Sequence, residues 1–120
     1  MKISPISILG PDERGYTAEY YHERLGLQLI VFRKAGTVSG RHYHKGTSLS
    51  KNPEIFMLLS GTMTLNWRDV NGTAVQSAEI TGPTRIEIPP YTWHELIAKT
   101  DCTALELGSI TEHKNDTFYD

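Results

Sequence analysis

The stretch that decides the fold is Ser39–Gly61, "SGRHYHKGTSLSKNPEIFMLLSG", which contains two histidines, a glutamate and a closing glycine. His42 and His44 are separated by a single residue, and side chains in that relation on a β-strand face the same side. If "RHYH" is a strand, the two imidazoles point together and Tyr43 points away. Neutral imidazole is a common metal ligand, so the pair could be part of a metal site. The alternative is that both are solvated residues on an exposed strand.

Two further candidate ligands follow along the chain. Glu54 opens the apolar run "EIFMLLS", where its carboxylate could add a hard oxygen ligand, and His94 follows the Pro-Pro turn of "IPPYTWHE". Three histidines and a carboxylate suit a divalent first-row metal ion with open positions for water or substrate. Zinc, iron, nickel and manganese all accept this ligand set, so the sequence does not choose among them.

Short apolar and β-branched runs alternate with turn clusters along the whole chain, which predicts an all-β protein. We expect one strand at 25–34, two strands within 54–68 joined at Ser60-Gly61, and a hairpin turn at Asn71-Gly72. Strands that recur about every ten residues favour a sandwich or a barrel. The expected apolar walls of its interior are Phe56, Leu58, Met63, Leu65 and Ile88.

Composition limits the class of protein. The 120 residues correspond to a single domain, 1–120, and the net charge of -2 without a basic block argues against a nucleic-acid partner. The single cysteine, Cys102, cannot form an internal disulfide, which fits a reducing compartment. Pro5, Gly10 and Pro11 interrupt the N-terminal stretch, so we expect no signal peptide, no membrane partner and a cytoplasmic location.

The spacing of these residues resembles the two motifs of the cupin superfamily. Gly36-x5-His42-x-His44 with Glu54-x6-Gly61 resembles the first motif, at about 36–61, and Pro89-x4-His94 resembles the second, at about 82–98. The resemblance implies a single-domain cupin, an RmlC-like jelly-roll barrel. It also implies that four side chains converge on one divalent metal inside the barrel: His42, His44, Glu54 and His94.

Two departures from the cupin pattern affect the surroundings of the site. Between His44 and Glu54 the chain has nine residues, Lys45–Pro53, which is more than the pattern has. We expect them to form a loop at the barrel mouth that shapes the pocket. Tyr91 replaces the usual glycine of the second motif and Ala98 its usual asparagine, but both changes leave His94 in place.

The segments "PDERGYTAEY", "GRHYHK" and "PPYTWHE" are similar to small sugar-nucleotide cupins, including dTDP-sugar 3,4-ketoisomerases and 3,5-epimerases. This similarity implies an isomerase or epimerase that acts on a carbohydrate or a related polar metabolite. By the same resemblance, His42 or His44 would be the general base, and a metal or a polar group would stabilise the enolate. If the strand is regular, Tyr43 points away from the histidines, so Tyr91 or Tyr21 is a better candidate for the acid.

Other readings share the same ligand set. A three-histidine, one-glutamate site that holds iron is typical of cupin dioxygenases, and a non-catalytic cupin would bind a small ligand without turnover. The cupin resemblance also implies a homodimer that pairs through an edge strand. His22 and His113 lie outside both motifs and are not expected to have a function. The polar tail "TEHKNDTFYD" is expected to be loosely ordered or to pack against a partner subunit.

Overall fold

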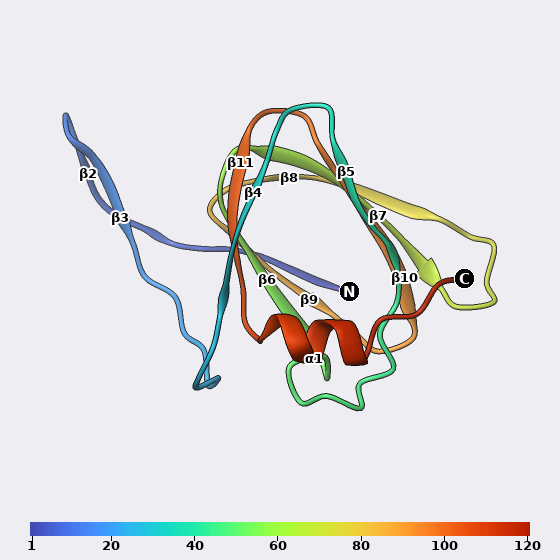
Figure 1. Ribbon diagram of the computed structural model, residues 1–120. Helices are drawn as coiled ribbons and strands as arrows, with labels where there is room; N and C mark the ends of the chain where they lie inside the picture. Colours follow the sequence, from blue (N-terminus) through green and yellow to red (C-terminus); the bar gives the residue numbers. More distant parts are fainter.

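The computed structural model describes residues 1–120, and two antiparallel β-sheets that face each other form its body (Figure 1). In spatial order, the larger sheet contains β1 (Lys2–Pro5), β9 (Thr84–Ile88), β6 (Glu54–Ser60), β11 (Cys102–Glu106) and β4 (Leu29–Arg33). The smaller sheet contains β5 (Val38–His42), β10 (Thr92–Ala98), β7 (Thr62–Asp69) and β8 (Gln76–Thr81). The predicted all-β jelly-roll architecture is therefore confirmed.

The main core lies between the two sheets. The larger sheet contributes Phe56, Leu58, Ile86 and Ile88, and the smaller sheet contributes Met63, Leu65, Ile80, Leu96 and Ala98. All five expected wall residues, Phe56, Leu58, Met63, Leu65 and Ile88, are buried in this core. Strand β6 is also covered on its outer face, where Ile55 and Met57 pack with Leu107. This double burial explains why its sequence is a continuous apolar run rather than an alternating one.

Strict alternation places the polar side chains of the interior. In β10, Thr92, His94, Leu96 and Ala98 are buried, and the residues between them are partly exposed. Since side chains alternate across a strand, His94 shares the inward face with two apolar residues. In β11 the same alternation turns Cys102, Ala104 and Glu106 inward. Both strands therefore carry one ionisable side chain into an otherwise apolar space.

The strand expected at 25–34 is shorter than predicted. It begins only at Leu29, and the side chain of Leu25 is 96% exposed. Gly26 adopts a φ of +90°, a conformation that glycine allows and that does not continue a strand. Leu25 and Leu27 therefore do not pack against the core, although apolar residues alternate there in the sequence.

Both turn predictions in the middle of the chain are confirmed. The break between β6 and β7 falls at Gly61, whose φ is +94°. A Cβ atom at this position would lie 2.3 Å from the carbonyl oxygen of Asp101, so only glycine fits the close approach. Asn71, with a φ of +66°, forms the turn between β7 and β8, although β8 starts at Gln76, later than the sequence pattern suggested.

The C-terminal tail is ordered and packs on its own barrel. Helix α1 (Ile110–Asn115) lies across one end of the barrel (Figure 1). Ser109 caps its N-terminus by accepting a hydrogen bond from the Glu112 amide at 3.1 Å. Beyond the helix, Phe118 and Tyr43 exchange two backbone hydrogen bonds of 2.9 Å each. The tail thus closes over the segment that follows β5, and the expected loose order is not observed.

The N-terminal part projects from this body. Strands β2 (Ile8–Asp12) and β3 (Gly15–Ala18) form a separate two-stranded hairpin that extends away from the sheets (Figure 1). Nearly every residue of this hairpin is exposed, so it has no core of its own. No helix of the chain has the length and apolar character needed to cross a bilayer.

Candidate functional site

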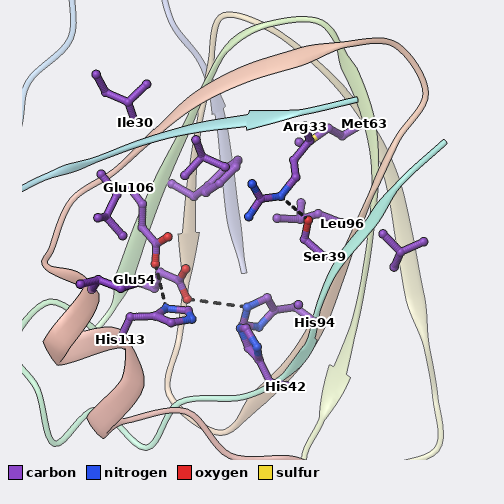
Figure 2. Close-up of a pocket in the computed structure, with 16 residues that line it drawn as sticks. Ile30, Arg33, Ser39, His42, Glu54, Met63, His94, Leu96, Glu106 and His113 are labelled. Atoms are coloured by element: carbon purple, nitrogen blue, oxygen red, sulfur yellow. Dashed lines mark hydrogen bonds and ion pairs between the residues drawn. The ribbon is translucent and has the colours of Figure 1, made fainter. Parts of the chain in front are cut away.

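A pocket of about 500 Å³ opens between the sheets beside helix α1 (Figure 2). Its deep part carries ionisable side chains, and its walls are apolar. The ionisable residues that line it are Arg33, His42, Glu54, His94, Glu106 and His113. The apolar walls come from both sheets and include Leu29, Val31, Phe56, Met63 and Leu96. Such apolar surroundings lower the local dielectric and strengthen every charge interaction in the pocket.

A bulge in β5 turns His42 into this pocket. His42 pairs directly with His94 across the β5–β10 ladder, and the next pair joins Gly40 to Glu95. Arg41 is therefore an extra residue, and it adopts a φ of +59°. The backbones approach so closely here that a Cβ atom on Gly40 would lie 2.8 Å from the His94 carbonyl oxygen. The sequence Gly40-Arg41-His42 thus aims one imidazole at its cross-strand partner.

Three histidines converge at the deep end, as the sequence predicted. The potential ligand nitrogens of His42, His44 and His94 all lie within 4.8 Å of one another. Strand β5 ends at His42, but the side chains continue to alternate between the two faces beyond it. Tyr43 points outward and stacks on Tyr91. We call His42, His44 and His94 the histidine trio.

Backbone carbonyls orient two rings of the trio. The Nδ1 atom of His44 lies 2.7 Å from the carbonyl oxygen of Asp116, and that of His94 lies 2.9 Å from the carbonyl oxygen of Thr92. Because a carbonyl oxygen only accepts hydrogen bonds, both Nδ1 atoms carry the hydrogen. The Nε2 atoms then face the carboxylate of Glu54. Metal-ligating histidines are commonly oriented through the same type of contact.

Glu54 meets the trio at its buried end. Its Oε2 atom lies 2.5 Å from His44 Nε2 and 3.7 Å from His94 Nε2 (Figure 2 draws the second contact). His44 Nε2 and Glu54 Oε2 are both buried and have no satisfied hydrogen bond. If His44 is neutral, two lone pairs face each other at this distance, which is repulsive unless a proton or a metal ion lies between them. The donor set therefore fits a divalent cation held by the trio and Glu54.

Burial sets the protonation of these side chains. Desolvation, together with the nearby imidazoles of His94 and His44, lowers the pKa of His42 to about 3. Burial also lowers the pKa of His94. Burial alone would raise the pKa of Glu54, but its close contact with His44 and the nearby His94 and Lys51 side chains hold it well below its usual value. Neutral His42 and His94 beside an ionised carboxylate are ready to bind a cation without releasing protons.

The loop from Lys45 to Pro53 is tied to the C-terminal tail. The Asp116 side chain is fully buried, and its carboxylate accepts hydrogen bonds from the amides of Lys45 (2.8 Å) and Ser48 (3.1 Å). Arg24 holds the other end of the loop by donating to the carbonyl oxygens of Ser50 and Pro53. Since the Asp116 carbonyl also orients His44, the tail positions both the loop and the trio.

Besides Arg33, three ionisable residues of the site were not predicted from the sequence. Lys51, in the loop, is only 2% exposed and contacts the carboxylates of Glu54 and Glu106. His113, on α1, lies 3.2 Å from Glu106 through Nδ1, and its ring centre is 5.3 Å from that of His42. For Glu106 a signal existed, because it shares the inward parity of Cys102 and Ala104. No local pattern marks Lys51 or His113.

The structure does not bring Tyr91 into the pocket. Tyr91 is 53% exposed and has a backbone φ of +58°, and its ring stacks against that of Tyr43 at 6.1 Å between ring centres. Its amide donates a 2.7 Å hydrogen bond to the His44 carbonyl oxygen, so the backbone of Tyr91 supports the trio although its side chain faces outward. The role of acid that the sequence suggested for Tyr91 or Tyr21 has no support in this geometry, since Tyr21 is 69% exposed and also lies outside this pocket.

Comparisons with known proteins agree with the fold. No protein-family model matches the chain, and no curated protein matches its sequence. Among solved structures it is similar to a double mutant of the 3,4-ketoisomerase QdtA from Thermoanaerobacterium thermosaccharolyticum in complex with TDP. That match has a TM-score of 0.74 and 16% identity, and covers 99% of this chain and 86% of the other.

Two further solved structures are similar. A 3,4-ketoisomerase from Helicobacter canadensis matches with a TM-score of 0.71 and 18% identity, over 99% of this chain and 90% of the other. The dTDP-4-dehydrorhamnose 3,5-epimerase from Sulfolobus tokodaii matches with a TM-score of 0.62 and 20% identity, over 83% of this chain and 64% of the other. At these identities the likeness concerns the fold, which is the expected cupin fold.

Proposed function

We propose that this chain is a metal-binding cupin enzyme that isomerises or epimerises a carbohydrate or a related polar metabolite. The observation that carries the proposal is the convergence of the histidine trio and Glu54 beside an apolar-walled pocket, which His42, His94 and Glu54 line. The solved structures with the same fold support it, because they include 3,4-ketoisomerases and a 3,5-epimerase. A divalent metal held by His42, His44, His94 and Glu54 would polarise a substrate carbonyl as a Lewis acid.

Other pocket residues would supply the base and exclude water. Isomerisation beside a carbonyl needs a base that takes a proton from carbon. Of the two histidines of the first motif, only His42 lines the pocket, so it is the better placed base. A ring nitrogen that binds a metal cannot also accept a proton, so metal analysis decides which role His42 has. The apolar walls from Leu29, Phe56 and Met63 exclude water from the reacting carbon.

Arg33 fits the outer end of a substrate that carries an anionic group. Its side chain lines the pocket, and its Nε atom donates a 2.7 Å hydrogen bond to Ser39 Oγ (Figure 2). Guanidinium groups bind phosphate oxygens in a planar, bidentate manner. A sugar nucleotide would therefore place its sugar at the trio and its phosphates toward Arg33.

A solvent-exchange experiment tests the proposed reaction. An enzyme that removes a proton beside a keto group exchanges it with solvent, so wild-type protein in D2O should introduce deuterium into a keto sugar. TDP-4-keto-6-deoxyglucose, which a mutant QdtA binds in a solved structure, is the first probe. We expect a His42→Ala/His94→Ala variant to exchange at least about 100-fold more slowly. A folded wild-type protein that exchanges no proton of any keto-sugar probe would contradict the proposed reaction.

The same double variant tests the metal site. We expect wild-type protein, purified without a tag or chelator, to contain about one equivalent of divalent metal, and the His42→Ala/His94→Ala variant to contain almost none. Elemental analysis measures this directly. Equal metal contents in the two proteins would contradict the assignment of the trio as ligands.

The trio and Glu54 also suit a dioxygenase, because ferrous iron accepts three histidines and one carboxylate. Iron in the purified protein, with oxygen uptake in the presence of a substrate, would favour that second candidate. Tight binding of a small ligand without turnover would favour a non-catalytic cupin.

We also propose that the chain forms a homodimer. Strand β4 is an edge of the larger sheet, and its outer face exposes Ile30 (81%) and Phe32 (53%). Long exposed edges with apolar residues invite pairing with another chain, and a two-stranded hairpin such as β2–β3 is only marginally stable alone. Light scattering should give twice the chain mass of 13.5 kDa. An Ile30→Glu/Phe32→Glu variant should give the single mass, and a monomeric wild type would contradict the dimer.

A further inference from the structure

Lys51 is a buried cation near the trio that the proposed reaction does not use. Its ammonium group makes a short ion pair with Glu106 Oε1 and lies 3.0 Å from His113 Nδ1 and 3.6 Å from Glu54 Oε1. These three partners come from β11, α1 and the start of β6, so distant parts of the chain converge on one lysine. Burying an ammonium group is costly unless such partners compensate it. We call Glu54, Glu106 and His113 the cation cage.

The cage has the chemistry of a metal site. Two carboxylate oxygens and an imidazole nitrogen are ligands that divalent cations accept, and here an ammonium group occupies their centre. Figure 2 shows Glu54, Glu106 and His113 grouped on one side of the pocket, next to His42 and His94. Glu54 belongs to both sites, because its Oε2 atom faces His44 and its Oε1 atom faces Lys51. A carboxylate that bridges two cations is the arrangement of two-metal sites.

We propose that Lys51 is a tethered second cation, whose ammonium group fills the cage of Glu54, Glu106 and His113 and so limits the pocket to one metal ion. The charges agree with this role. Lys51 offsets one of the two buried carboxylates and leaves one negative charge for a cation at the trio. Lys51 also holds Glu54 by one oxygen, which directs the other oxygen to the trio. Lys51 is thus a positioning residue, and it contacts no substrate.

This inference deepens the proposed function, since Glu54 is common to both sites, but its test counts metal ions and needs no substrate. In a Lys51→Met variant the side chain stays unbranched, becomes one atom shorter and loses its charge. After metal-free protein is saturated with zinc and dialysed, we expect the variant to retain one equivalent more than wild type, two against one. A Lys51→Met/Glu106→Gln variant should return to one equivalent, because the cage then lacks a carboxylate.

Two controls separate this inference from the proposed metal function. Lys45→Met removes an exposed lysine from the same loop and should bind zinc like wild type. If wild type binds no zinc, the proposal for the trio fails, but the difference of one equivalent between Lys51→Met and wild type still tests the cage. A folded Lys51→Met variant with the wild-type zinc content would overturn the inference.

A further variant covers the case in which Lys51→Met does not fold. Glu106→Gln keeps the lysine, and we expect it to leave the zinc content at the wild-type value, since Glu106 holds Lys51 and not the metal. Loss of zinc in Glu106→Gln would make Glu106 a metal ligand and overturn the inference. The inference would also be overturned if wild type bound two equivalents of zinc and the Glu106→Gln variant bound only one.

Discussion

Glu54→Gln is expected to weaken divalent-metal binding by at least about 100-fold while leaving the metal-free fold nearly as stable as wild type. Changing groups that only orient metal ligands typically costs 10–100-fold in affinity, and Glu54 is placed to be a charged ligand itself. The amide would keep the shape of the carboxylate. Its NH2 group can donate to His44 Nε2, which is buried without a satisfied hydrogen bond, and its oxygen can accept from Lys51.

The stability of the metal-free protein distinguishes this explanation from general damage to the pocket. We expect Glu54→Gln to change the free energy of unfolding by less than about 1 kcal/mol, because each buried polar atom keeps a partner. Glu54→Ala removes the partners of both His44 and Lys51, so it should cost about 3 kcal/mol. Competition with a chromophoric chelator measures affinity, and urea unfolding in EDTA measures stability. Metal affinity within a few-fold of wild type in Glu54→Gln would exclude Glu54 as a ligand.

The predicted part of the site depends on patterns that are local in the sequence. His42 and His44 share a face because of strand alternation, and the same alternation in β10 turns His94 inward. The bulge at Arg41 could not be predicted, but His42 and His44 still face the same side, as expected. Each of these placements requires only that a short segment be a strand whose buried face is apolar.

The unpredicted part depends on contacts between distant segments. The loop that carries Lys51 takes its shape from Asp116, which lies 71 residues beyond Lys45, and from Arg24, which lies 26 residues before Ser50. His113 reaches the pocket because α1 packs across the end of the barrel. A helix of six residues is too short for its sequence pattern to predict where it packs. Leu25 is the converse case. The local alternation of apolar residues predicted that its side chain would be buried, but in the fold it is exposed.

These two parts of the site have different physical roles. His42 and His94 sit on paired strands, whose ladders hold ring positions firmly, and His44 follows directly after β5, whereas Lys51 and His113 sit on a loop and a terminal helix. The two are joined through Glu54 and through Asp116, whose carbonyl orients His44 and whose carboxylate orders the loop. Changes in the tail should therefore affect the proposed metal site, although the tail contains none of its predicted ligands.

Acidification of the metal-free protein is the second large effect that we expect. The pKa of His42 is about 3 in the folded chain and about 6.5 when unfolded. Between these values the unfolded state binds a proton that the folded state does not, so stability falls as the pH falls. One such group lowers the free energy of unfolding by about 1.4 kcal/mol per pH unit, and its contribution is fully present above about pH 6.5. His94, whose pKa burial also lowers, acts in the same direction.

Urea unfolding in EDTA from about pH 7.5 to pH 5 measures this dependence, and Trp67 and Trp93 supply the fluorescence signal. Below about pH 6.5, His42→Gln should reduce the slope of unfolding free energy against pH by about 1.4 kcal/mol per unit, because it removes one differential proton. Met63→Ala, in the wall of the same pocket, should lower stability at every pH and keep the wild-type slope. If His42→Gln also kept the wild-type slope, the pKa of His42 would be the same in the folded and the unfolded chain, and burial would not keep its imidazole neutral over this pH range.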